Sequence, residues 1–123
     1  EAVLPSSVIR QMGEEEMNQY RKAFTKAADR QPTLNWPRQI PIDGEPPHMV
    51  DLVASYGEWM ATNQELPKLF INADPGSILT GKARKFCRTW PNQKEVTVAG
   101  THFIQEDSPV EIGIAVAEWL KTI

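Results

Sequence analysis

The feature that most constrains this chain is a pair of short apolar runs in its second half, each followed by a helix-forming stretch. The first run, residues 68–72, is nearly continuous, which is typical of a strand buried on both faces of a parallel sheet. The pattern then predicts a helix over 77–90, a second strand over 94–99 and a final helix over 109–122. This order of strand, helix, strand, helix indicates an α/β fold with a parallel sheet.

Two parallel strands are too few for a stable α/β domain, because both edges of the sheet would be open and at least one face bare. We therefore expect these strands to be the end of a larger sheet. Residues 1–65 are predicted to be helical, with five prolines between residues 29 and 47 and a long amphipathic helix over 48–62. This layout is typical of a cap inserted before the end of a core domain. The predicted domains are a cap over 1–65 and part of a core over 66–123.

His102 lies on the loop between the second predicted strand and the last helix. Gly100 ends the strand and lets the backbone turn. Ser108 and Pro109 have the sequence of a helix start, in which the serine hydroxyl accepts from the amide of Glu111. His102 thus follows the carboxyl end of a strand, the edge where open α/β sheets bind ligands. An imidazole there is a candidate general base; the alternative is a loop histidine that is only hydrogen-bonded.

Composition excludes two classes of partner. The 123 residues carry a net charge of −3, so no basic field favours nucleic acid, and no apolar run approaches the ~20 residues of a membrane span. We predict neither kind of partner, no metal and no cofactor, and a location in the cytoplasm with the periplasm as the alternative. The single Cys87 has no nearby base in the sequence, so we expect a buried, reduced thiol and not a catalytic thiolate.

Four strings carry a resemblance to a known family: TLNWPRQIPI at 33–42, LPKLFINADPG at 66–76, FCRTWPNQ at 86–93 and HFIQEDSP at 102–109. In this order they resemble the haloalkane dehalogenases of the α/β-hydrolase superfamily, most of all the type from the lindane-degradation pathway. The resemblance covers nearly the whole chain. It implies that residues 1–65 are most of the helical cap, and that residues 66–123 are the C-terminal part of the α/β-hydrolase core.

The resemblance also implies a reaction. In this family an aspartate attacks the carbon that bears the halogen, which gives an alkyl-enzyme ester and free halide. A histidine then activates water to hydrolyse the ester, and His102 matches that base. The implied partners are a haloalkane substrate, water and a halide product. The nucleophile elbow, halide-binding side chains and oxyanion hole of the family have no match here. We therefore expect the N-terminal part of the same enzyme, in this or a separate chain, to complete the site, and the chain alone to be inactive.

Three carboxylates near the predicted strand ends require separate assignments. Asp74 follows the first strand and is one candidate for the acid that orients the histidine. The subfamily that the chain resembles uses a glutamate upstream of Glu1 instead, so a capping role in the turn at 75–79 is the expectation for Asp74. Glu106 and Asp107 are expected to be dipole and capping charges at the entrance to the last helix.

Further residues resemble the active-site lining or access tunnel of the family. For the apolar ones, plain core packing is the alternative. Ser7 occupies a tunnel position where a larger aliphatic residue is common, and therefore predicts a wider or wetter tunnel mouth. The pocket or tunnel candidates are Val3, Ser7, Trp36, Pro37, Ile40, Ile78 and Phe103.

Two other functions compete with the dehalogenase. The first is a coelenterazine-luciferase-like oxygenase, which uses a closely related fold and also resembles the chain at Asp74-Pro75-Gly76. The second is a non-catalytic complementation fragment that serves assembly only. The string that contains Trp36-Pro37 favours the dehalogenase.

Overall fold

The computed structural model describes residues 2–123, which form two compact units. The strand unit contains the residues up to Gln11 together with Ala61–Ile123, and the helical unit contains Met12–Met60. The first eleven residues thus group with the strands by their contacts, although they precede the helical unit in the sequence. The division into a cap over 1–65 and a core over 66–123 stays a prediction.

The strand unit follows the predicted order of strand, helix, strand, helix. Its strands are parallel neighbours whose register runs from Lys68 opposite Gln93 to Pro75 opposite Gly100. Its elements are η1 (Pro5–Ser7), β1 (Lys68–Pro75), α4 (Gly81–Cys87), β2 (Gln93–Gly100), α5 (Ile104–Asp107) and α6 (Pro109–Leu120). The side chains of β1 alternate between buried and half-buried from Lys68 to Ala73.

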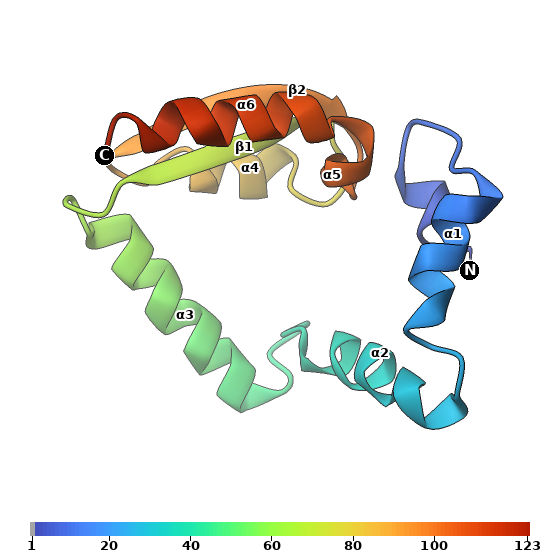
Figure 1. Cartoon of the computed structure of the whole chain (residues 1–123). Coiled ribbons are helices and arrows are strands. Elements are labelled where there is room, and N and C mark those ends of the chain that lie inside the picture. The colour runs from blue at the N-terminus through green and yellow to red at the C-terminus, as the bar shows by residue number, and fades with distance from the viewer. Residues whose placement is uncertain (1) are drawn as a thin grey trace. The chain divides into compact units, whose positions relative to one another are not determined.

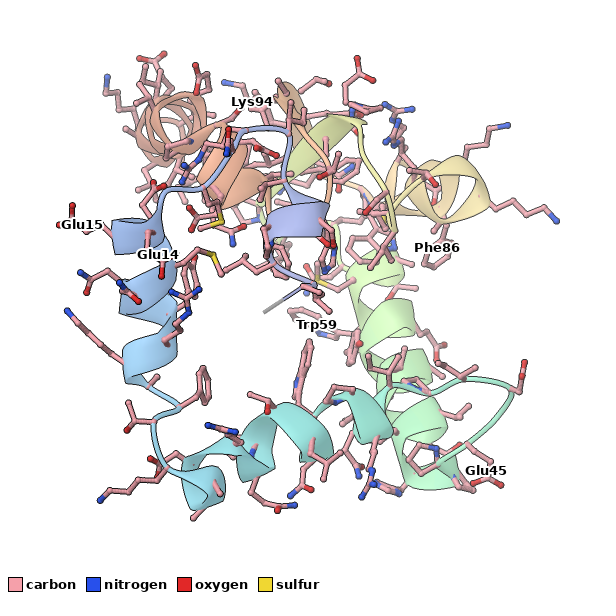
Figure 2. The ribbon with its side chains drawn as sticks, turned by 90° about the vertical axis from the view of Figure 1, so that its right-hand side faces the viewer. Glu14, Glu15, Glu45, Trp59, Phe86 and Lys94 are labelled. Atoms are coloured by element: carbon pink, nitrogen blue, oxygen red, sulfur yellow. The ribbon has the colours of Figure 1, made fainter. Side chains whose placement is uncertain are left out.

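Helices lie on both sides of the strand pair. Helix α6 contacts both strands, and it turns the buried Ala115 and the half-buried Ile112 and Val116 toward them. Figure 2 looks nearly along the strands and shows α6 on one side and α4, which carries the labelled Phe86, on the other (Figures 1 and 2). Phe70 of β1 and Val98 of β2 are buried between these layers. This two-sided cover is the arrangement of a parallel α/β sheet.

The helix after β1 is shorter than the predicted 77–90. It runs only over Gly81–Cys87, because the backbone turns first. Gly76 and Gly81 have φ angles of +74° and +52°, a region that glycine enters without steric cost. Cys87, which follows in this helix, is a free thiol and is half-buried rather than buried.

The start of α6 differs from the predicted capping box. Pro109 occupies the first turn as expected, but the Ser108 hydroxyl makes no bond to the helix start. Ser108 is buried, and its Oγ donates to the carbonyl oxygen of Ala99 at 2.7 Å. The capping prediction is therefore wrong: the serine ties the beginning of α6 to the end of β2, because a buried hydroxyl needs a partner and the strand carbonyl is near.

The helical unit consists of short helical pieces followed by one long helix, as the proline pattern predicts. The pieces are α1 (Glu14–Lys22), η2 (Ala27–Arg30), α2 (Gln31–Asn35) and η3 (Pro37–Gln39), and the long helix is α3 (Pro47–Thr62), whose last two residues belong to the strand unit (Figure 1). Helix α1 begins with an acidic first turn, where Glu16 accepts from the amide of Gly13 at 2.7 Å. No helix among residues 2–123 has the length and apolar character needed to cross a membrane.

Candidate active site

His102 follows the end of β2 and is held by its backbone. Its amide donates to the carbonyl oxygen of Ser7 at 3.2 Å, and the amide of Phe103 donates to the same oxygen at 3.2 Å. The hydroxyl of Thr101 is a third donor to that oxygen, at 2.7 Å. One carbonyl near the beginning of the chain therefore fixes three consecutive residues of the histidine loop.

Ser7 is itself fixed by the short helix η1. Its amide donates to the carbonyl oxygen of Leu4 at 3.0 Å, so the carbonyl of Ser7 points away from the helix and toward the histidine loop. The side chain of Ser7 is half-buried. The sequence singled out Ser7 for its side chain, whereas the structure uses its backbone, which no sequence pattern indicates.

Two carboxylates fasten the same N-terminal segment to the loop. Asp107 Oδ1 accepts from the amides of Ile9 at 2.8 Å and Arg10 at 3.2 Å, and its Oδ2 accepts from the amide of Thr101 at 3.4 Å. Arg10 donates from Nη2 to Glu106 Oε2 at 2.8 Å and from Nε to the carbonyl oxygen of Glu106 at 2.6 Å. The expectation that Glu106 and Asp107 are charges for the last helix misses these contacts, which join segments far apart in the sequence.

The imidazole of His102 is exposed and lies edge to face against Phe103, with ring centroids 4.5 Å apart and an interplanar angle of 62°. Within residues 2–123 neither ring nitrogen makes a hydrogen bond. One nitrogen can therefore donate its N–H to an orienting carboxylate, while the other accepts a hydrogen bond from a water molecule. This is what a general base needs, since the acid fixes the tautomer while the base takes a proton from water.

The end of β1 lies beside the end of β2 but is built differently. Asp74 is opposite Ala99 in the register, is exposed, and makes no side-chain hydrogen bond within the described chain. The expected turn cap by Asp74 is therefore wrong. Arg84 braces the turn instead: Nη2 donates to the carbonyl oxygens of Ala73 at 2.8 Å and Pro75 at 3.1 Å, and Nε donates to that of Leu79 at 3.2 Å. No sequence pattern indicates this role of Arg84, because a brace of this kind depends on the path of the turn.

The remaining pocket candidates are distributed over both units. Ser7, His102 and Phe103 come together in the strand unit, and Phe103 is half-buried. Val3 and Ile78 belong to the same unit and are 69% and 72% exposed. The other three lie in or next to η3 of the helical unit, and all are exposed: Trp36, Pro37 and Ile40. The pocket roles of these seven residues stay predictions.

One charged pair near the strands shifts the pKa of its members. Arg88 follows α4 and donates from Nε to Glu95 Oε2 at 2.8 Å and from Nη2 to Oε1 at 2.6 Å. This hydrogen bonding lowers the pKa of the Glu95 carboxyl below its usual range and raises the pKa of Arg88. The pair ties α4 to β2 and lies outside the histidine loop. No three His, Cys, Asp or Glu side chains of the described chain are grouped as a metal site would require.

Comparison with known proteins identifies relatives over the full length of the chain. No family model matches it. It is 53% identical over 124 residues to a haloalkane dehalogenase of Sphingobium indicum, of which it covers 42%. The crystal structure of haloalkane dehalogenase DbeA from Bradyrhizobium elkani matches 99% of the chain with a TM-score of 0.90 and 36% identity, over 42% of its own length. A coelenterazine h 2-monooxygenase of Renilla reniformis is 38% identical over 129 residues.

The chain thus spans about two fifths of the length of the relatives it matches. Its identity to the dehalogenase of Sphingobium indicum exceeds its identity to the monooxygenase. Over its full length the chain is therefore similar to haloalkane dehalogenases, and its fold matches the C-terminal part of their α/β-hydrolase fold.

Proposed function

We propose that this chain carries the water-activating base and the cap of a haloalkane dehalogenase. The observation that supports this most is His102, fixed by its backbone at the carboxyl end of β2 with both ring nitrogens open, in a chain 53% identical to such an enzyme. The reaction converts a haloalkane and water into an alcohol, a halide ion and a proton. His102 acts in its second half.

In the first half, an aspartate carboxylate outside this chain attacks the carbon that bears the halogen. A carbon–oxygen bond forms as the carbon–halogen bond breaks, and the halide leaves with the electron pair. In the second half, His102 takes a proton from water, which attacks the carbonyl of the alkyl ester. The tetrahedral intermediate then breaks its carbon–oxygen bond to the alkoxide, which takes the proton of the added hydroxyl and leaves as the alcohol. The carboxylate is regenerated, and the proton on His102 passes to the solvent. The nucleophile, the orienting acid and the halide donors belong to the N-terminal part of the enzyme, which is the proposed partner of this chain.

A dry, shaped pocket suits this chemistry, because a carboxylate is a stronger nucleophile once water is excluded. We assign its lining or its tunnel to Val3, Ser7, Trp36, Pro37, Ile40, Ile78 and Phe103. Ser7 would widen the tunnel mouth, since its hydroxymethyl group is smaller than an aliphatic side chain. A Ser7→Leu variant should lower kcat/KM for bulky haloalkanes more than for short ones, whereas equal values would contradict the tunnel role. The Ser7→Leu variant keeps the backbone carbonyl of residue 7, so the contact that holds the histidine loop is the same in the variant and the parent.

The proposal is tested in a chimera in which this chain replaces the matching segment of the Sphingobium indicum dehalogenase. The chimera should release bromide from 1-bromobutane with repeated turnover. Light from coelenterazine without bromide release would favour the second candidate, an oxygenase, which the 38% identity to the Renilla reniformis enzyme supports. A folded chimera that does neither would favour a fragment that serves assembly only.

We also make proposals on the compartment of the protein and on the partners that it does not bind. We place it in the cytoplasm, with the periplasm as the alternative, and we propose that it binds neither nucleic acid nor membrane. The formal net charge of −3 supports the first exclusion, because binding to phosphate needs a basic surface. Fractionation of the source cells, followed by detection of the chain, would test the compartment.

A further inference from the structure

The histidine loop and the segment at residues 7–10 are joined at two separate points. The first is the Ser7 carbonyl, which accepts from the amides of His102 and Phe103. The second is the Asp107 carboxylate, which accepts from the amides of Ile9 and Arg10, 98 and 97 residues earlier in the chain. The two points hold opposite ends of the same short segment. The segment can therefore neither slide nor rotate against the loop while both are intact.

Asp107 also acts on the loop directly. Its Oδ2 faces the amide of Thr101, the residue before His102, at 3.4 Å. The Asp107 carboxylate thus bridges Thr101 and the segment at residues 7–10. The same segment holds the backbone amide of His102 through the Ser7 carbonyl. Bonds from amides to an ionised carboxylate are roughly twice as strong as neutral ones. The side chain of Asp107 is half-buried, so water competes with these bonds only in part.

We propose that Asp107 is a positioning residue for His102. It holds Thr101 on one side of the Ser7 carbonyl contact and Ile9 and Arg10 on the other, and this contact sets where the imidazole lies relative to the ester. This inference rests on the proposed function. A base must lie within hydrogen-bond reach of the water it activates. A misplacement of about 1 Å can lower a rate on the order of 10²-fold. Only the hydrolysis half of the reaction uses His102, so only that half should respond.

Two substitutions test the positioning role by removing different numbers of the Asp107 contacts. Asp107→Ala removes all three acceptor contacts. Asp107→Asn keeps one oxygen for the amides of Ile9 and Arg10 but turns an NH₂ group toward the amide of Thr101, where two donors meet. The asparagine variant keeps most of the packing and serves if the alanine variant does not fold. The matched control is Glu118→Gln on α6, where an exposed carboxylate pairs with Lys121 at 3.5 Å.

The experiment is single-turnover kinetics of the chimera with 1-bromobutane. Ester formation, followed as bromide release, should stay within about twofold of the parent in every variant. Ester hydrolysis should fall on the order of 10²-fold in Asp107→Ala and roughly 10-fold in Asp107→Asn, and remain unchanged in Glu118→Gln. An equal fall in both steps would show a merely structural role and overturn the proposal. Unchanged hydrolysis in both variants would overturn it as well.

A second measurement separates this inference from the proposed function. If the parent chimera does not turn over, the proposed function fails, and amide hydrogen exchange decides the inference. The amides of His102 and Phe103 should then exchange at least 10-fold faster in Asp107→Ala than in the parent, while the amides between β1 and β2 keep their protection. Equal exchange of the two loop amides in both proteins would overturn the positioning role.

Discussion

The two strand ends of the strand unit are neighbours in one register, yet they are fixed by different means. At the end of β1, the turn that follows Asp74 is braced locally, by Arg84 from the next helix. At the end of β2, the loop that carries His102 is held by residues from the beginning of the chain, through the Ser7 carbonyl and the Asp107 carboxylate. Asp74 lies in the strand ladder opposite Ala99, whereas the backbone of His102 is anchored to the first residues of the chain.

This difference indicates which strand end must hold a side chain in a precise position. A local brace is enough to close a turn, because the residues involved are close in sequence and little chain entropy opposes the contact. Holding a loop through residues about a hundred positions away fixes it to the rest of the fold. We infer that the β2 end is built to place a side chain and the β1 end to continue the chain. Substitutions at the two strand ends of the chimera test this contrast.

The largest expected difference in turnover is between substitutions of His102 and of Asp74. His102→Phe should lower steady-state turnover on the order of 10²- to 10⁴-fold, because the ester is no longer attacked by activated water. Asp74→Asn should change turnover by less than about twofold, since the Asp74 carboxylate has no partner in the described chain to lose. Steady-state bromide release measures both. A comparable loss in Asp74→Asn would place the orienting acid at β1 and reverse the contrast.

The next effect compares two glycines at the strand ends: Gly100, the last residue of β2, and Gly76, the first residue after β1. A Cβ at Gly100 would lie 2.8 Å from Ile104 Cγ2 and 3.3 Å from its Cα, so Gly100→Ala must displace the start of α5 and with it the histidine loop. We expect a loss of about 1–3 kcal/mol in the free energy of unfolding together with reduced turnover.

Gly76→Ala is the matched variant at the other strand end. Gly76 has φ +74°, and a Cβ there would lie 2.6 Å from Arg84 Nη2 and 3.0 Å from the carbonyl oxygen of Ala73. The cost should be about 1–2 kcal/mol, but turnover of the folded protein should be unchanged. Denaturant unfolding and bromide release test the pair. Lost turnover in Gly76→Ala alone would contradict the division of roles.

A smaller effect is expected from the brace of the β1 turn. Arg84→Gln removes the guanidinium that donates to the carbonyl oxygens of Ala73, Pro75 and Leu79. The free energy of unfolding should fall by about 1 kcal/mol, and hydrogen exchange should rise over 76–80 but not over 101–103. Lys85→Gln, an exposed neighbour on α4, is the control and should change neither quantity. Increased exchange at 101–103 would show that the two strand ends are coupled.

The smallest effect concerns pH. Arg88 lowers the pKa of Glu95, so the folded carboxyl releases its proton more readily than the unfolded one. The stability this provides is complete above the ordinary glutamate pKa of about 4.3 and is lost as the pH falls through the lowered folded value. Glu95→Gln should therefore make stability less dependent on pH between about pH 6 and pH 3. Urea unfolding of the chimera across this range measures it, with Glu118→Gln as the control. An unchanged pH profile in Glu95→Gln would contradict this role.

The order of strands and helices could be predicted because its signals are local. The apolar run at 68–72, the helix over 48–62 and Pro109 at the first turn of α6 each depend on neighbouring residues only. His102 was also found this way, since a strand, a turn and a helix start frame it. The relatives confirm the resemblance to the haloalkane dehalogenases that the four sequence strings carry.

The supports of the site could not be predicted, because they depend on contacts between distant segments. Ser108 has the sequence of a helix cap, but the Ala99 carbonyl takes its hydroxyl. Asp107 was expected to serve the last helix, and instead holds residues 9 and 10. Ser7 contributes its carbonyl, which every residue type has. In each case a tertiary partner outcompeted the local one.

We have proposed that His102 activates the water that hydrolyses an ester made by a nucleophile outside this chain. The most direct measurement is the intact mass of the His102→Phe chimera after reaction with 1-bromobutane, together with the bromide released. We predict that the mass of the protein rises by one butyl group. One bromide ion per site should be released into solution, with no further release. Sustained bromide release from an unmodified protein would contradict the account.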